Sequence, residues 1–345
     1  MSRTKYSIGV MLLFIAVFLS CKKSASFDIT GDPQVKFFAN NAGFGNYPQN
    51  TFMYSIVNIP NASGNGLVNL SSTIPDSIRF PVFATAPVSQ DVTISAELDT
   101  SLIAAYNTAN GTNYHAFPSG ILDVGNLVAH ISKDSTISAD SVTIVSNAAD
   151  LSECTDTAYM APVRLTSVSN PAAGAITTTA SRIVYIIART EQRLIKYNAT
   201  TADVQGSLVS PRTSWSVSFT PTLATSGSIT DGSTNTYARW APPVSPYGQI
   251  DINMQASKNV TGIRLYTSTS STYAPAQVTV YASNDGINYT LMGSPLKANI
   301  TYTSGYDYIL FYKAIAAQYI RVQLYYSTST STNNGRIAEF DVYAN

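Results

Sequence analysis

Charged residues, histidine and cysteine are scarce in this chain. Its 345 residues include 20 Lys and Arg, 20 Asp and Glu, two His and two Cys, and the formal net charge is zero. A neutral chain has no electrostatic basis for binding nucleic acid. The sequence also lacks the Gly-x-Ser-x-Gly, His-Glu-x-x-His and phosphate-loop motifs, and its four glutamates show no paired arrangement typical of a glycosidase. We therefore predict that the protein is not an enzyme.

A long apolar run is present near the N-terminus. Arg3 and Lys5 precede an apolar stretch over 8–19, which is shorter than the ~20 residues of a membrane-spanning helix. Ser20-Cys21 then follows, and residues 1–20 resemble a bacterial lipoprotein signal. The resemblance implies that Cys21 is lipidated, with 21–33 as a tether. The alternative is an ordinary signal peptide followed by a chance cysteine.

Lipidation of Cys21 would leave Cys154 without a disulfide partner, so an exported protein of this kind must be stabilised by its hydrophobic core. No histidine lies near Cys154 in the sequence to activate it, which favours an unreactive structural thiol.

Tyrosine is abundant, with 22 residues, and the composition is typical of extracellular β-sandwiches. Alternating apolar residues predict strands over 91–98, 141–147 and 181–188. One helix is expected between Asp99, which can cap its start, and Gly111, which can end it. The length is typical of two domains, and we predict an all-β protein.

Residues 34–190 contain a recognisable series of positions. The stretch 99–118 carries Tyr106-Asn107, Gly111, Tyr114 and Pro118, and a strand with a Tyr, Pro-Val, Leu pattern follows at 159–170. This series resembles the Bacteroidota domain of unknown function numbered seventeen thirty-five. The resemblance implies an immunoglobulin-like sandwich at the head of a surface lipoprotein, and it implies no chemistry.

A charged segment, 191–204, breaks the strand pattern and is predicted to link the two domains. The second domain, 205–345, contains six segments that in this order resemble the discoidin, or coagulation factor five/eight type C, module; they are 213–219, 228–240, 248–266, 278–289, 317–326 and 336–344. The resemblance implies a jelly-roll β-sandwich. Within it, Asn284-Asp285-Gly286 is predicted to turn a β-hairpin rather than to hold a metal, because the following residues lack acidic ligands.

In carbohydrate-binding members of this family, an Asp-Gly loop and the closing Glu commonly surround one structural Ca²⁺. The matching residues here are Asp231, Thr236 and Glu339, and Ser233 stands where Asp or Asn is frequent. The resemblance therefore implies a calcium site with oxygen ligands, although with a lowered ligand charge. The alternative is that Asp231 and Ser233 only tie the turn through side-chain hydrogen bonds.

Glycan binding requires an exposed aromatic ring with planar hydrogen-bonding groups beside it. Two loops offer such groups, which are Tyr273 in 267–276, and Tyr326, Asn333, Asn334 and Arg336 in 325–336. Trp240 could lie in the core or be exposed. The His and first-loop Arg of galactose-binding relatives have no counterpart here, which argues against galactose specificity.

The sequence predicts a non-catalytic lipoprotein of the outer membrane that binds a poly- or oligosaccharide, with possible protein partners in a surface glycan-uptake complex. It does not decide between display on the cell surface and a periplasm-facing position. The runner-up is a protein-binding or adhesive scaffold, and a glycoside hydrolase is the weakest alternative.

Overall fold

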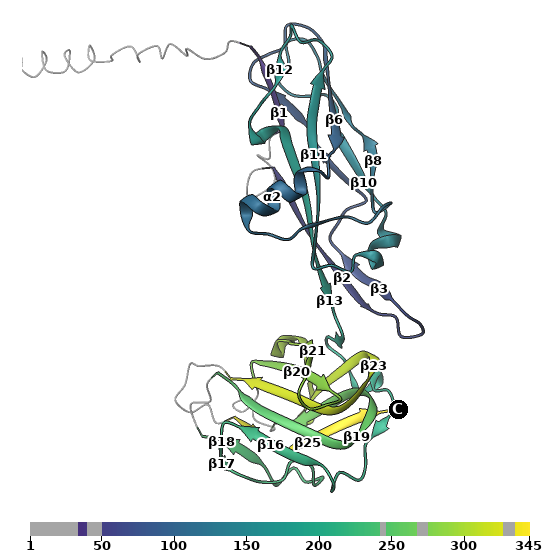
Figure 1. Ribbon diagram of the computed structural model, residues 1–345, viewed down its shortest axis with the longest axis vertical. Coiled ribbons are helices and arrows are strands. Elements are labelled where there is room, and N and C mark those ends of the chain that lie inside the picture. The colour runs from purple at the N-terminus through teal and green to yellow at the C-terminus, as the bar shows by residue number, and fades with distance from the viewer. Residues whose placement is uncertain (1–33, 40–49, 242–245, 268–274, 327–334) are drawn as a thin grey trace, which may run out of the picture.

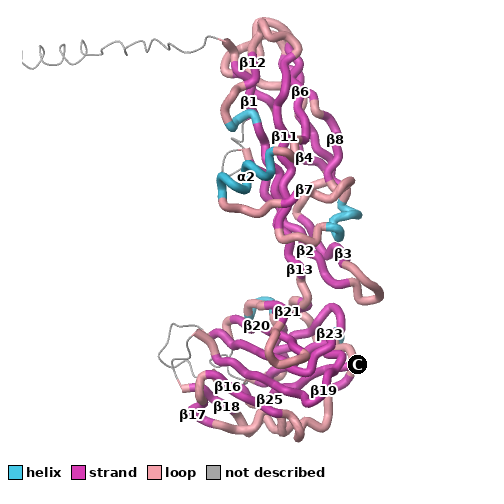
Figure 2. The backbone as a smooth tube through the Cα atoms, viewed as in Figure 1, coloured by secondary structure: helices cyan, strands magenta, loops and turns pink. Residues whose placement is uncertain are grey.

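The computed structural model describes residues 34–39, 50–241, 246–267, 275–326 and 335–345. The predicted signal, Cys21 and the tether all lie outside these residues. Among the described residues, no helix is both long and apolar enough to cross a bilayer. The chain is mostly β-structure, as the alternation of its apolar residues predicted (Figures 1 and 2).

The first domain is built from short strands and one α-helix. The strands are β1 (Lys36–Ala39), β2 (Thr51–Pro60), β3 (Leu67–Ser72), β4 (Ser77–Phe80), β5 (Val82–Ala84), β6 (Val92–Leu98), β7 (His115–Ala116), β8 (Leu122–Asn126), β9 (Val128–Ile131), β10 (Val142–Ser146), β11 (Ala158–Val168), β12 (Ala175–Ile176) and β13 (Ile183–Gln192). The largest sheet has the order β3-β2-β13-β11-β6-β9, and β7 pairs with β11 at its side. Two smaller sheets, β4-β10-β8 and β12-β1-β5, complete the domain.

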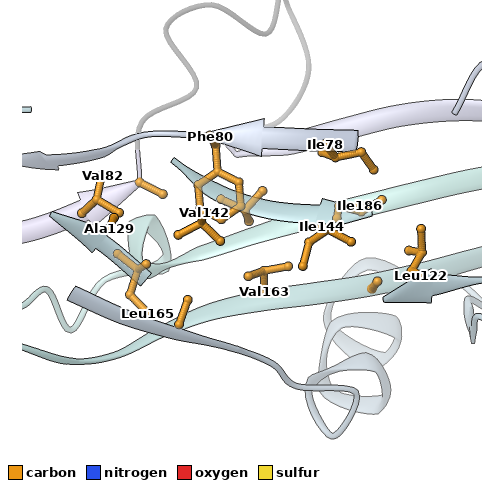
Figure 3. Packing of buried hydrophobic residues seen from close by; sticks show 14 of the residues in the cluster. Ile78, Phe80, Val82, Leu122, Ala129, Val142, Ile144, Val163, Leu165 and Ile186 are labelled. Carbon is orange, nitrogen blue, oxygen red and sulfur yellow. The ribbon is translucent and has the colours of Figure 1, made fainter. Parts of the chain in front are cut away.

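The sheets pack face to face around an apolar core. Ile78 and Phe80 of β4 and Ile144 of β10 lie across from Val163 of β11 and Ile186 of β13 (Figure 3). Each of these side chains is at most 1% exposed. Every second residue of a strand faces the same side, so alternation in β4, β10 and β11 delivers one apolar face per sheet. The predicted sandwich is confirmed.

Helix α2 (Leu102–Asn110) lies where the sequence predicted a helix. The Asp99 carboxylate accepts hydrogen bonds from the backbone N–H and the hydroxyl of Ser101, just before the helix begins. Gly111 ends the helix in the left-handed conformation at φ 63°, which a residue without Cβ adopts at little cost.

The segment predicted as a linker is largely part of the second domain. Strand β14 (Ile195–Lys196) pairs with β23 (Tyr306–Tyr325), and Ile195 is 2% exposed in the second core. Further on, Ala199 packs in a small cluster with Leu310. The charged residues around Ile195 and Ala199 made the segment look like a linker in the sequence, although both side chains are buried. Nearby, the Lys313 ammonium donates a hydrogen bond to the Gly64 carbonyl in the β2–β3 turn of the first domain, at 2.6 Å.

The second domain is a sandwich whose two longest strands serve both layers. The two longest are β19 (Gly248–Tyr266) and β23. Besides these and β14, the domain contains β15 (Ser207–Leu208), β16 (Ser216–Thr220), β17 (Leu223–Thr225), β18 (Ala238–Trp240), β20 (Gln277–Ser283), β21 (Thr290–Gly293), β22 (Thr301–Thr303), β24 (Arg336–Ile337) and β25 (Glu339–Ala344). The pairing of β19 with β23 shifts register between Asn253 and Lys258, where Gln255 has φ 67°. Such a bulge bends a strand, and it divides β19 between the layers.

One layer contains β16, the first part of β19, the last part of β23, β20 and β21. The other contains β15, β25, the second part of β19 and the first part of β23, with β14 and β22 on β23. A separate small sheet has the order β17-β18-β24. Inward residues such as Ile252, Ile320 and Val342 are at most 1% exposed. The predicted discoidin-type sandwich is confirmed.

The Asp285-Gly286 hairpin is also confirmed, with a wider turn than two residues. The Asp285 carboxylate accepts hydrogen bonds from the backbone N–H groups of Ile287 and Asn288, both at 2.8 Å, and Gly286 has φ 74°. These hydrogen bonds to the charged form lower the pKa of Asp285, with the Asn288 side chain as the largest contribution. The turn binds its own backbone and leaves no carboxylate for a metal.

Candidate functional site

Backbone hydrogen bonds join described residues of the second sandwich that lie beside the gaps 242–245, 268–274 and 327–334. The Trp240 N–H donates to Gly335 O at 3.0 Å, Ala276 N–H to Tyr325 O at 2.7 Å, and Ala338 N–H to Tyr266 O at 2.8 Å. Strands β18, β20, β23 and β24 therefore meet at one end of the sandwich. The predicted ligand residues Tyr273, Asn333 and Asn334 lie outside the described structure.

Two predicted ligand residues at this end belong to the core. Trp240 is 0% exposed and Tyr326 is 7% exposed, and both pack in the second core. Gly248 and Gly335 lie against these rings, where a Cβ would come within 2.8 Å of Trp240 or 2.5 Å of Tyr326. The expectation that Tyr326 is an exposed sugar platform is wrong. Its position was readable, because period-two alternation from the inward Leu324 also points Tyr326 inward.

Arg336 is the predicted ligand residue that stays accessible in the described structure. Its guanidinium carbon lies 3.9 Å from the centre of the Tyr237 ring, and both side chains are half-buried. A guanidinium stacked on an aromatic ring is held in one orientation. Sequence reasoning did not select Tyr237, which precedes β18 and meets Arg336 through the pairing of β18 with β24.

The predicted calcium loop is closed by its own hydrogen bonds. Asp231 Oδ1 accepts from the Ser233 N–H at 2.9 Å, and Asp231 Oδ2 accepts from the Thr236 hydroxyl at 2.8 Å. Ser233 Oγ in turn accepts from the Asn235 N–H at 3.2 Å. This is the turn-tying arrangement that was the alternative to a metal site.

Glu339 meets this loop, as expected, but it also meets a cation of the chain itself. Its Oε2 accepts from the Gly232 N–H at 3.1 Å, and its Oε1 accepts from Arg212 Nη1 at 2.6 Å. Arg212 also pairs with Asp341, which in turn accepts from Arg264 Nε at 2.7 Å. Burial raises the pKa of Glu339 to about 7, against the opposing effect of the Arg212 charge.

These contacts decide how well the residues fit a calcium ion. All four carboxylate oxygens of Asp231 and Glu339 already accept from N–H or O–H groups, and Arg212 supplies a positive charge. Among the described residues, no group of three or more His, Cys, Asp and Glu side chains could hold a metal. As arranged, the residues do not form a calcium shell, because an ion at Glu339 would have to displace the Arg212 guanidinium. The arrangement favours the turn-tying alternative, and chelation tests whether calcium binds.

Cys154 is the ionisable side chain of the first domain that the sequence singled out. Cys154 is fully buried, and burial, with Glu153 and Asp156 nearby, raises the pKa of its thiol to about 12. The thiolate needed for nucleophilic attack is therefore rare at neutral pH. His130 pairs with Asp140 at 2.6 Å on the surface.

Two family models match the chain. A model for an N-terminal domain matches residues 47–172, and the model for the F5/8 type C domain matches residues 210–340. Both lie inside the segments in which the sequence resembled two such domains. A comparison with curated proteins finds no match.

A two-domain protein of unknown function from Bacteroides fragilis has a similar structure, with a TM-score of 0.52, 14% identity, and coverage of 90% of this chain and 94% of that one. This likeness shows the shared fold. Two modules from Clostridium perfringens also match part of the chain. A family 32 carbohydrate-binding module in complex with galactose has 20% identity, a TM-score of 0.32 and coverage of 39% and 96%. A module in complex with GalNAc-β-1,3-galactose has 16% identity, a TM-score of 0.34 and coverage of 40% and 100%.

Proposed function

We propose that the second domain binds a poly- or oligosaccharide and that the chain does not transform it. The observation that carries this proposal is Arg336 stacked on Tyr237 at one end of a sandwich that the F5/8 type C model matches. Sugars present an apolar C–H face, on which an aromatic ring can stack, and hydroxyl groups in the ring plane. Planar groups such as Arg336 can bind those hydroxyls with a defined direction.

Tyr273, Asn333 and Asn334 are proposed to complete this site from the neighbouring segments. A shallow site of this kind is expected to be weak, with Kd in the millimolar to high micromolar range, or roughly −4 to −6 kcal/mol. Many anchored copies meeting a polymer with repeated epitopes would then supply useful retention.

The proposed location is the cell envelope, with Cys21 as the lipid anchor and the outer membrane as its support. An anchored, non-catalytic glycan-binding protein suits a polysaccharide capture system, in which neighbouring proteins would be its partners. The bases for this location are the charged start, the apolar run at 8–19 and Ser20-Cys21.

A protein-binding scaffold is the second candidate. The strand β3 lies at the edge of the largest sheet, and its Val68 and Leu70 are 44% and 43% exposed. An exposed edge strand with apolar side chains offers a template for pairing with another chain. Substituting both residues by Lys should abolish capture of a protein partner and leave glycan binding unchanged.

The test of glycan binding is affinity electrophoresis of purified 22–345 in gels containing galactomannan, xyloglucan or glycol chitin. We expect at least one polymer to retard the wild-type chain, and Tyr273→Ala to weaken that retardation without lowering the melting temperature. Tyr302→Ala, at a 39% exposed tyrosine on β22, is the matched control. Retardation by none of the polymers, or equal retardation of wild type and Tyr273→Ala, would contradict the site as proposed.

A further inference from the structure

The outward face of one layer of the second domain carries an unusual set of side chains. On β19, β20 and β23 the inward residues are apolar and buried, so the residues between them face outward. The set comprises Ser216, Ser218, Gln249, Asp251, Asn253, Tyr281, Tyr319, Arg321, Gln323 and Tyr325. It contains neither Lys nor Glu, the long flexible residues that commonly cover a solvated sheet. Most of its members end in a planar amide, carboxylate, guanidinium or ring.

Hydrogen bonds join these planar groups across the strands. Gln323 Nε2 donates to Gln249 Oε1 at 3.0 Å, and Gln249 Nε2 donates to Asp251 Oδ2 at 2.8 Å. Arg321 Nε donates to Asp251 Oδ1 at 2.6 Å, and the Arg321 guanidinium carbon lies 3.9 Å from the centre of the Tyr289 ring. The orientations of the polar groups are therefore fixed before any ligand arrives, which lowers the entropy that binding must spend on ordering them.

The β20–β21 hairpin turn borders this row of hydrogen-bonded planar groups, the polar track. The hairpin turn of Gly286 and Tyr289 lies over the sheet, and the Tyr319 ring packs 3.0 Å from where a Gly286 Cβ would be. The Tyr289 side chain is half-buried in this position. Ser216 and Ser218 of the edge strand β16 border the other side of a shallow, open hollow of about 320 Å³.

We propose that this sheet-face hollow is a second glycan-binding site, for an uncharged stretch of a polysaccharide. The hollow offers tyrosine rings for C–H faces and fixed donors and acceptors for hydroxyl groups, from Asn253, Asp251 and Arg321. Its size is at the lower end of small-ligand sites, which are about 300–1,000 Å³.

Charge selects among the possible ligands. Asp251 and Arg321 are the charged residues that line the hollow, and they neutralise each other. An acidic polysaccharide or a nucleic acid would find no unpaired cation there. An apolar peptide would leave the polar track without partners, which costs binding energy. A neutral hexose or N-acetylhexosamine segment satisfies both conditions.

The inference rests on the proposed function, because it assigns further subsites to the same glycan-binding domain. One domain with two separate sites would hold a long polymer more tightly than an oligosaccharide that reaches only one of them. The sheet-face hollow is formed wholly by described residues of β16, β19, β23 and the β20–β21 turn.

The test uses the 22–345 chain in the same gels, with polygalacturonate as an anionic comparison. Ser218→Trp fills the hollow from an exposed position, and Tyr319→Ala removes one of its rings; melting curves check that both variants fold. We expect each to weaken retardation by a neutral polymer at least about fivefold, the loss of roughly one good contact. Tyr302→Ala should have no effect, and polygalacturonate should not retard the wild type.

The outcomes separate the two proposals. If Tyr273→Ala weakens retardation while Ser218→Trp and Tyr319→Ala, both folded, match the wild type, the sheet-face site is wrong and the proposed function stands. If the sheet-face variants lose retardation and Tyr273→Ala does not, the sheet-face site alone is supported. Retardation by polygalacturonate alone overturns the neutral ligand class, and retardation by no polymer overturns both proposals.

Discussion

Arg212 Nη1 lies 2.6 Å from Glu339 Oε1, and this ion pair joins residues 127 positions apart. Arg212 precedes β16, and Glu339 begins β25, the last strand of the second sandwich. The Arg212 side chain is 15% exposed and that of Glu339 is 2% exposed. A pair this well shielded from water fixes the start of the domain against its end and holds the Gly232 turn in place.

Removing the guanidinium should destabilise the second domain. Arg212→Gln leaves Glu339 and Asp341 buried without their shared cation, and breaking a buried pair in this way costs about 3–5 kcal/mol. Urea unfolding of 22–345 should show this loss in the transition of the second domain. Arg189→Gln, at an exposed arginine of the first domain, should change stability by less than about 0.5 kcal/mol. Equal midpoints for the two variants would contradict the role of Arg212.

Glu339 should make stability depend on pH in a definite direction. Its folded pKa of about 7 is above the unfolded value, so between pH 4.5 and 7 the folded state retains a proton that the unfolded state has lost. The contribution of Glu339 is therefore fully present below pH 4.5 and is lost as the pH rises through 7. Each pKa unit corresponds to about 1.4 kcal/mol.

The measurement compares wild type with Glu339→Gln at pH 5 and pH 7.5. The wild type should lose about 1–3 kcal/mol more than the variant over this interval, because Gln does not titrate. Using the difference between the two chains removes the effect of every other titrating group. A larger loss in Glu339→Gln would reverse the sign and disprove the raised pKa.

Chelation should distinguish calcium from the arginine as the cation at Glu339. With Arg212 in place, we expect EDTA to leave the melting temperature of the second domain unchanged. A bound ion would instead stabilise the folded state, by about 2.7 kcal/mol at 100 times its Kd. A fall in melting temperature with EDTA that Asp231→Ala abolishes would establish the calcium site of Asp231, Ser233, Thr236 and Glu339.

Lipid anchoring is predicted at Cys21. A Cys21→Ala variant should lose palmitate labelling and membrane association, because the thiol is the acceptor of the lipid. Cys154→Ala is the matched control, since its thiol is buried in the first core and is not available. If Cys21→Ala still fractionates with the outer membrane and carries label, the anchor lies elsewhere.

The sequence alone determined the elements that depend on local pattern. Alternation places Ile320, Val322 and Leu324 inward, and carried one step further it also buries Tyr326. The Asp285-Gly286 turn follows from short-range chemistry, because the Asp carboxylate binds backbone groups two and three residues away. Each of these features needs no knowledge of distant residues.

Only the tertiary structure decided which distant groups meet. The resemblance placed Glu339 beside the Asp231 loop, but only the structure shows that Arg212 pairs with Glu339 where it is buried. Likewise, Arg321 is 70 positions from Asp251 and 32 positions from Tyr289 in the sequence. The three side chains meet because β19, β23 and the β20–β21 turn lie side by side. Strand pairing sets such neighbours, and pairing depends on how the whole sandwich closes around its core.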